Sequence, residues 1–301
     1  MLHANARAAD IPVGPSPILN AQLTSGSVTI RVWNRPQVRI TTDGRIDWRY
    51  LTTAQIPHIP SEIDFWSQTA TTPLGSVTLP LEAFLLPALP GNHDAVTLRG
   101  YGATTITMPA QTALIVTRIA GRGDITISDY RGTLVATTNA GAIEVQRVAG
   151  TAYLQVLRGR IFVADSTFDR VRARSGVGPV VFSSCSAGQI VETSALGAVI
   201  YDDGTLGQGP AHFGSEFGNV AVGISGAPAA MHHSPGGNTT VTFGPGSAVT
   251  ASSAHGSVLT YSGALGAHRD LLGRWPRGAV LLRTHGPAPM MRPPIRRRRR
   301  F

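Results

Sequence analysis

The carboxylates that could form an acid/base pair or bind a cation are sparse, with 17 acidic residues among 301. Asp202-Asp203-Gly204 could bind calcium or form the acidic site of a polysaccharide-cleaving enzyme. Asp165, Asp169 and Glu192 could approach that segment, although their spacing does not require it. The Asp-Asp-Gly sequence is equally typical of a turn. We therefore predict no catalytic residues and no enzymatic activity.

A metal site is also not indicated, although several histidines lie late in the chain. Zinc ligands usually fall at i, i+2 on a strand or at i, i+4 on a helix, with carboxylates nearby. His232 and His233 are adjacent, so they would face opposite sides of an extended segment. We predict loop or surface positions, with no metal and no cofactor, for this set: His212, His232, His233, His255, His268 and His285.

Two further motifs suggest chemistry but have simpler interpretations. Arg122-Gly123-Asp124 is the tripeptide that integrin-binding proteins display, but Gly123 belongs to a regular glycine repeat and its neighbours occupy variable turn positions. Cys185 is the only cysteine, which excludes an internal disulfide and a cysteine-based zinc cluster. Since no His or Lys lies close to it in sequence to lower its pKa, we interpret Cys185 as a packed thiol.

The strongest charge feature is a run of arginines at the C-terminal end. The net charge is +9, the last ten residues hold six arginines and no acid, and the remainder therefore carries about +3 (9 minus 6). A guanidinium cluster of this kind can pair with phosphates or anionic headgroups. No aromatic stacking platform accompanies it, which argues against sequence-specific reading of nucleic acid. We predict weak, salt-sensitive binding to anionic lipid or another polyanion through Arg296, Arg297, Arg298, Arg299 and Arg300.

Composition indicates the fold class. The chain has 34 glycines and 21 prolines, and only 14% of its residues are charged. Apolar residues make up 42%, so this is not the composition of a disordered, highly charged chain. Abundant Gly, Thr and Val with few strong helix formers predict an all-β protein. No apolar run is long enough for a transmembrane helix.

A nine-residue repeat dominates the middle of the sequence. Apolar residues follow each repeat glycine at the second and fourth positions, as in Gly123-Asp-Ile125-Thr-Ile127. The glycines are Gly123, Gly132, Gly141, Gly150 and Gly159. The series continues with steps of nine or ten residues at Val171, Val180, Ile190 and Val199. Two residues after these lie Ala173, Phe182, Glu192 and Tyr201, among which only Glu192 breaks the apolar pattern.

Apolar residues at i and i+2 indicate short strands with one buried face, and the glycines provide the turns between them. Strands on so regular a spacing favour a β-solenoid, in which each strand stacks about 4.8 Å from its counterpart one coil away. Two repeats make a coil of about 18 to 20 residues. A hairpin meander with nine-residue units is the alternative.

The flanks carry weaker copies of the repeat. We expect strands at Gly26–Val32, Gln37–Ile40, Gly44–Trp48, Val96–Leu98, Thr105–Pro109, Ala113–Val116, Gly218–Val222, Thr240–Phe243 and Gly256–Thr260. The expected organisation is a flexible N-terminus over residues 1–17, a solenoid over 18–285 and a disordered basic tail over 286–301. A proline-rich insertion over 51–95 and a looser Gly/Pro-rich part over 203–239 interrupt the solenoid.

The order of these strands is similar to that of a known family. Gly26-Ser-Val28-Thr-Ile30-Arg-Val32-Trp33, then Ile106-Thr-Met108-Pro109, Leu114-Ile-Val116 and repeated units such as Gly141-Ala-Ile143 resemble the bacterial putative-adhesin family. That family is a domain of unknown function built as a single-stranded β-solenoid. The resemblance covers about residues 20–50 and 96–205. It implies a place at the cell envelope or surface, supplies no catalytic or binding residues and, with the general preference for right-handed crossovers, implies a right-handed coil.

The sequence therefore predicts a non-enzymatic structural or surface-interaction protein, adhesin-like, located in the cell envelope or secreted. Its partner would be a protein or glycan of the cell surface, with oligomerisation if the terminal coils are uncapped. The alternatives are an intracellular scaffold of polymerising β-helices and a carbohydrate-active β-helix enzyme. Ala4-Asn5-Ala6-Arg7-Ala8-Ala9-Asp10 is either the cleavage region of a signal peptide that starts further upstream or an ordinary frayed terminus.

The arginine run gives a first testable expectation. Truncation at Pro294 should reduce binding to vesicles that contain anionic lipid, because each guanidinium near such a surface contributes about 1 kcal/mol. Vesicle co-sedimentation at low and high salt measures this effect. Undiminished binding by the truncated chain would contradict it.

Overall fold

The fold is all-β, as the composition predicted. The computed structural model describes the backbone of residues 2–5, 8–52, 62–65, 68–72, 75–79, 82–85, 93–224, 230–233, 239–242 and 249–262, and side chains within 8–52, 93–224 and 249–262. Strands are the only regular elements over these ranges, and none of the ranges contains a helix that could span a membrane.

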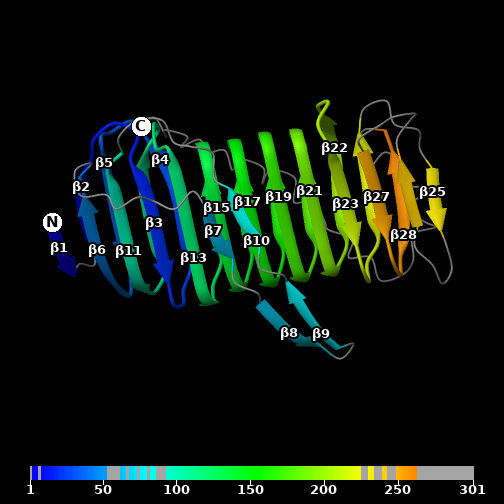
Figure 1. The fold of residues 1–301 in the computed structure, drawn as a ribbon. Helices are drawn as coiled ribbons and strands as arrows, with labels where there is room; N and C mark the ends of the chain where they lie inside the picture. Colours follow the sequence, from blue (N-terminus) through cyan, green and yellow to red (C-terminus); the bar gives the residue numbers. More distant parts are fainter. Residues whose placement is uncertain are drawn as a thin grey trace, which may run out of the picture.

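Most strands lie in two long sheets (Figure 1). Sheet A, which faces the viewer in Figure 1, has the spatial order β1 (Leu2–Asn5), β6 (Arg45–Leu51), β11 (Ala95–Tyr101), β3 (Ile18–Leu23), β13 (Leu114–Arg122), β15 (Arg131–Ala140), β17 (Ala149–Arg158), β19 (Thr167–Val177), β21 (Ser186–Leu196), β23 (Ala211–Ser215), β27 (Val249–Ser253) and β26 (Thr239–Thr242).

Sheet B lies behind sheet A, and its central strands also pair in parallel. Its spatial order is β2 (Ala8–Pro12), β5 (Gln37–Thr42), β12 (Thr104–Pro109), β4 (Val28–Trp33), β14 (Ile125–Ser128), β16 (Ile143–Gln146), β18 (Ile161–Ala164), β20 (Val180–Ser183), β22 (Val199–Leu206), β24 (Val220–Ile224), β28 (Ser257–Tyr261) and β25 (Ala230–His233). The end of β22, Thr205–Leu206, crosses to pair with β21 and joins the two sheets.

Each coil consists of a sheet A strand and the sheet B strand that follows it in the sequence. Successive nine-residue repeats alternate between the sheets, so equivalent strands pair one coil apart. Ile125 pairs with Ile143 and Ile143 with Ile161, in each case two repeats later, and Ile161 pairs with Val180. These pairings are parallel. A hairpin meander would pair its strands antiparallel, so that alternative is wrong.

The N-terminal end departs from sequence order. β11 pairs in parallel with β3, and β12 pairs in parallel with β4. The other edges of β3 and β4 pair with β13 and β14. Beyond it, β6 and β5 pair antiparallel with β11 and β12, and β1 and β2 form the outermost edges. Gln37–Ile40 and Gly44–Trp48 were expected as further copies of the repeat; they lie instead in these antiparallel end strands, because alternating apolar residues satisfy either pairing direction.

The C-terminal end has a similar arrangement. Gly218–Val222 and Gly256–Thr260 lie in the parallel strands β24 and β28, which continue the stack. Thr240–Phe243 was expected as a later copy, but its described part lies in β26, which pairs antiparallel with β27. The outer strand β25 is likewise antiparallel to β28. Antiparallel strands therefore cover the last parallel strands at both ends of the stack.

Parts of the expected insertion and N-terminus form strands. Within 51–95, β7 (Glu62–Phe65) pairs antiparallel with β10 (Glu82–Leu85), and β8 (Gln68–Thr72) with β9 (Gly75–Leu79). These two small sheets are separate from sheets A and B, and β8 and β9 lie beside β17 and β19 (Figure 1). The expected tail, 286–301, lies outside the described residues.

The space between the sheets is the core. Side chains at alternate positions of each strand point inward and form apolar columns that cross the coils. One such column comprises Val28, Ile125, Ile143, Ile161, Val180, Val199, Val220 and Val258, each buried. Aromatic rings enlarge the core in the later coils, where Phe168, Phe182, Tyr201 and Phe213 contact one another in turn.

A column of glycines runs along one corner of the stack. At each position after the first, an added Cβ would lie well inside van der Waals contact with the carbonyl oxygen of the preceding glycine in the column. Gly159 and Gly178 also have positive φ angles of 143° and 135°, which residues with a side chain rarely adopt. In spatial order, the column comprises Gly102, Gly26, Gly123, Gly141, Gly159, Gly178, Gly197, Gly218 and Gly256.

Hydroxyl groups bind these glycine carbonyls from inside the stack. The Ser194 Oγ donates to the Gly178 carbonyl at 2.8 Å, and Ser215 donates to Gly197 at 2.8 Å. Equivalent bonds to the glycine column come from Thr138, Ser175 and Ser253. Each hydroxyl lies three residues before a column glycine, so the repeat encodes the donor as well as the turn.

The glycine column gives a stability prediction. Gly159→Ala should lower the free energy of unfolding by about 3 kcal/mol or more, because the new Cβ meets backbone at a positive φ. Gly207→Ala is the matched control: Gly207 is exposed and its Cβ would meet its nearest neighbour at 3.1 Å. Denaturant unfolding monitored by circular dichroism compares them, and equal losses would contradict the prediction.

Candidate ligand-binding face

Three arginines line the outer face of β19. Val171 and Ala173 point into the core, so Arg170, Arg172 and Arg174 point outward from the same strand. Residues two apart on a strand are about 6.6 Å apart, so the three charges form a line. At that separation in water, neighbouring charges repel by about 0.6 kcal/mol. We call this set the arginine strip.

Polar and apolar side chains of the next strand flank the strip. In register, Arg170, Arg172 and Arg174 lie beside Gln189, Val191 and Thr193 of β21. Arg170 is exposed, and its Nε donates to the Gln189 Oε1 at 3.1 Å.

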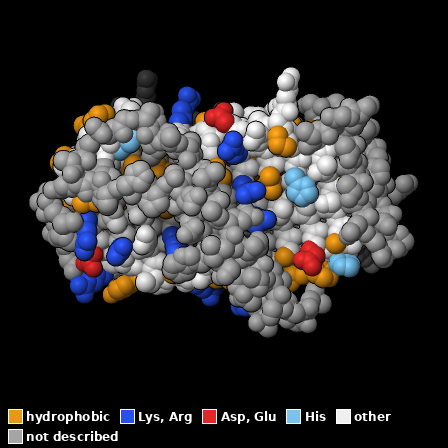
Figure 2. Space-filling view, in the orientation of Figure 1, with side chains coloured by type: hydrophobic (Ala, Val, Ile, Leu, Met, Phe, Trp, Pro, Cys, Tyr) orange, Lys and Arg blue, Asp and Glu red, His pale blue; other side chains and the backbone are white. Residues whose placement is uncertain are grey.

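Among the described strands around the strip, one acidic residue points outward. Apart from Asp169, no acidic residue points outward from β15, β17, β19, β21 or β23 of sheet A, as their pairing and burial show. Asp169 is exposed at the bulge before Arg170. Figure 2 shows arginine side chains gathered over the middle of this face.

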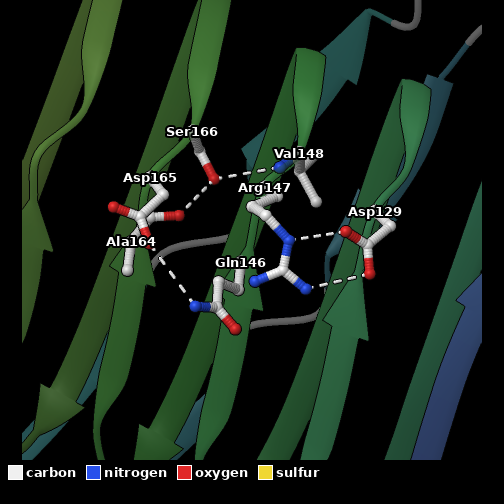
Figure 3. A network of polar contacts seen from close by, with 7 residues as sticks. All are labelled: Asp129, Gln146, Arg147, Val148, Ala164, Asp165 and Ser166. Atoms are coloured by element: carbon white, nitrogen blue, oxygen red, sulfur yellow. Dashed lines mark hydrogen bonds and ion pairs between the residues drawn. The ribbon is translucent and has the colours of Figure 1, made fainter. Parts of the chain in front are cut away.

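A second polar region follows the corner between the two sheets (Figure 3). Asp129, Arg147 and Asp165 occupy equivalent corner positions with positive φ angles of 60°, 52° and 50°. Arg147 donates two hydrogen bonds to Asp129, at 2.6 and 3.0 Å, and this pairing lowers the pKa of the Asp129 carboxyl. Gln146 donates to Asp165 at 3.4 Å. Arg147 and Asp129 are about half exposed, so the pair contributes at most about 1 kcal/mol.

The structure does not gather the predicted acidic candidates. Asp203 is exposed at a corner with φ of 52°, whereas Asp202 accepts a hydrogen bond from the Tyr261 hydroxyl at 3.0 Å. Asp202-Asp203-Gly204 is the bulge at which β22 turns from sheet B toward sheet A. Among the residues that the structure describes, no group of three His, Cys, Asp or Glu side chains could hold a metal ion.

Glu192 lies inside the core. Its register partners, Ala173 and Phe213, are buried, and Glu192 itself has no exposed surface. Neither carboxyl oxygen has a hydrogen-bond partner. Burial therefore raises the pKa of Glu192 well above its usual value near 4.5. The carboxyl is held as a neutral acid, which makes it a destabilising feature of the core rather than an exposed anionic site.

Cys185 and Tyr201 are buried close to this carboxyl. Burial raises the pKa of the Cys185 thiol to about 12, with the nearby Glu192 a smaller cause, so the thiol stays protonated at neutral pH. The interpretation of a packed thiol agrees with this position. The Tyr201 hydroxyl donates to the carbonyls of Cys185 and Thr205, at 2.9 and 2.8 Å, and so holds the bulged corner.

The remaining candidate residues whose side chains are described make contacts within the chain. Gly123 lies in the glycine column, and the Asp124 carboxylate accepts the Ala142 N–H at 2.7 Å. His212 is exposed on sheet A with its Nδ1 at 3.0 Å from the Thr250 hydroxyl, and the His255 ring stacks on Phe217.

Other candidates fall outside the described side chains. His232 and His233 lie on β25, of which only the backbone is described. His268, His285 and the run Arg296–Arg300 lie outside the described residues.

Comparison with known proteins yields no match: no family model, no curated protein and no solved structure is significantly similar to this chain.

The buried carboxyl gives a pH prediction. The folded state holds the Glu192 proton above pH 4.5 while the unfolded chain releases it, so this group's contribution to stability should fall by about 1.4 kcal/mol per pH unit between pH 4.5 and the raised pKa of the folded state. In Glu192→Gln this contribution disappears, and the variant should gain stability relative to the parent as the pH rises above 4.5. Glu144→Gln, on the outer face of sheet B, is the control. Parallel pH profiles for the parent and Glu192→Gln would contradict the assignment.

Proposed function

We propose that this chain is a right-handed β-solenoid that acts without catalysis, as an adhesin-like surface-interaction protein of the cell envelope. The regular parallel pairing of equivalent strands, two repeats apart, supports the solenoid. Right-handedness rests on the general preference for right-handed crossovers between parallel strands. The resemblance to the putative-adhesin family supports the place at the envelope.

The observation that favours a binding role is the outer face of sheet A. Flat strands present Arg170, Arg172 and Arg174 in one line, with Gln189 and Thr193 beside them. Positive charges on an outer face favour a partner of negative charge.

The experiment is localisation in the native host. The gene is expressed with its native upstream region, the cells are fractionated, and intact cells are treated with protease. We expect the chain in the envelope fraction, degraded by external protease while a cytoplasmic marker stays intact. An intact chain in the cytoplasmic fraction would contradict the proposal and would favour the polymerising scaffold, for which filament assembly by the purified chain is the test.

A further inference from the structure

We propose that the coil of β21 and β22 is a pH-sensitive gate, in which ionisation of the buried Glu192 carboxyl opens the corner beside it. Opening brings the Cys185 thiol, which is buried in the closed coil, into contact with solvent. This inference goes beyond the proposed function, because it concerns a conformational change within the stack and holds whatever partner the outer face binds.

An ionised Glu192 has no compensating partner in the closed coil. Its register partners Ala173 and Phe213 are buried and apolar, and neither carboxyl oxygen has a hydrogen-bond partner. The loss of solvent is the cause of its raised pKa, and no neighbouring charge offsets that loss. A buried carboxylate without a partner is strongly unfavourable, so ionisation has to be coupled to hydration of the side chain.

The groups that face Glu192 from other elements do not supply a positive charge. Its charge acts on three titratable groups, namely Cys185 at the corner, Tyr201 on β22 and Tyr261 on β28. Burial raises the pKa of each, so all three are neutral at physiological pH. The inward side chains of β19, β20, β23 and β24 carry no titratable group, and the arginines of β19 that flank Val171 and Ala173 point outward.

The bulge over residues 202–204 interrupts the regular pairing of this coil. The register of β22 with β24 shifts between Tyr201 and Gly204, and Thr205–Leu206 then pairs with Ser186 and Ala187 of β21. Two residue pairs therefore hold this strand end against β21. A strand end of this length can separate at lower cost than a full strand of the stack.

The Tyr201 hydroxyl holds the strand end closed beside the thiol. It donates to the carbonyls of Cys185 and Thr205, at 2.9 and 2.8 Å, and the Thr205 N–H donates to the Cys185 carbonyl at 2.9 Å. Tyr201 and Cys185 are also close enough to Glu192 for its charge to act on both. Release of Tyr201 with the strand end therefore admits water to the carboxyl and the thiol together.

The gate opens as the pH rises. The closed coil holds the Glu192 carboxyl protonated, whereas the open coil releases the proton once the pH exceeds the ordinary value of 4.5. The ratio of open to closed coils therefore rises about tenfold per pH unit, from there up to the raised pKa of the closed coil. Because each coil of a solenoid contacts only its neighbours, one coil can open while the rest of the stack stays folded.

Cys185 reports the opening because it is the only cysteine of the chain. The experiment measures the rate at which a pyridyl disulfide labels this thiol in the purified full-length chain, between about pH 5 and 8. Each rate is divided by that of Glu192→Gln at the same pH, so that the pH dependence of thiol chemistry cancels. Glu144→Gln, on the outer face of sheet B, is the matched control. Circular dichroism at the lowest pH establishes that each variant folds.

We expect the ratio of the parent to Glu192→Gln to rise by about tenfold per pH unit, until the pKa of the closed coil is reached. The ratio of the parent to Glu144→Gln should stay constant. The Glu192 charge raises the pKa of Cys185, so its direct effect on the thiol lowers the first ratio and cannot produce the rise. A flat first ratio would overturn the gate, because the thiol would then become exposed without hydration of the carboxyl.

Tyr201→Phe tests the corner itself. Loss of the hydroxyl should raise the labelling rate about tenfold at every pH, because two hydrogen bonds to carbonyls disappear, and should leave the slope with pH unchanged. An unchanged labelling rate would show that the thiol becomes exposed by another route and would overturn the assignment of this corner.

Low concentrations of urea separate the opening of one coil from complete unfolding. The labelling rate of the parent should depend weakly on urea, because one open coil exposes a small part of the surface that complete unfolding exposes. A slope equal to that of complete unfolding would show that the stack opens only as a whole, and the gate would be excluded.

Discussion

The close approach of successive coils at the glycine column is the constraint on which the rest of the structure depends. Each glycine after the first lies against the carbonyl of the preceding one, where a side chain has no room. The parallel hydrogen bonds, the inward apolar columns and the serine and threonine hydroxyl bonds all require this spacing. Every second glycine of the nine-residue repeat, as in Gly123, Gly141 and Gly159, therefore records a steric requirement at one corner.

The two sides of the sheets serve different needs. The interior accepts apolar residues and hydroxyl groups that bond to carbonyls, and Glu192 is the exception, since neither of its oxygens has a hydrogen-bond partner. Outward positions do not have to fit the packed interior, so Arg170, Arg172 and Arg174 can occupy one strand without disturbing the packing of Val171 and Ala173. The alternation of inward and outward residues along a strand thus separates stability from recognition.

The sequence predicted the stack where spacing alone determines it. From Gly123 to Val199 the apolar alternation identified the strands and their inward residues, but it did not predict that Glu192, which breaks the apolar pattern, would be buried at one of the inward positions. It did not predict the antiparallel end strands, because alternating apolar residues bury the same face in either direction. The arginine strip could have been found by the same alternation, since its members separate buried residues. Its neighbours on β17 depend on the bulge at Asp169, which changes the offset between these paired strands from 18 residues (Ala149 with Thr167) to 19 (Thr151 with Arg170), and spacing alone does not show such a bulge.

The insertion of β11 and β12 beside β3 and β4 has a consequence for the order of folding. Ile18 pairs with Ala95, far along the chain, whereas in the later coils Ile125 pairs with Ile143. The longer closure costs about 1.3 kcal/mol more in chain entropy, which grows with the logarithm of loop length. During synthesis on a ribosome, β3 and β4 therefore cannot complete their pairing with β11 and β12 until residues 95–109 have emerged. The later coils can each pair with the preceding coil as they emerge.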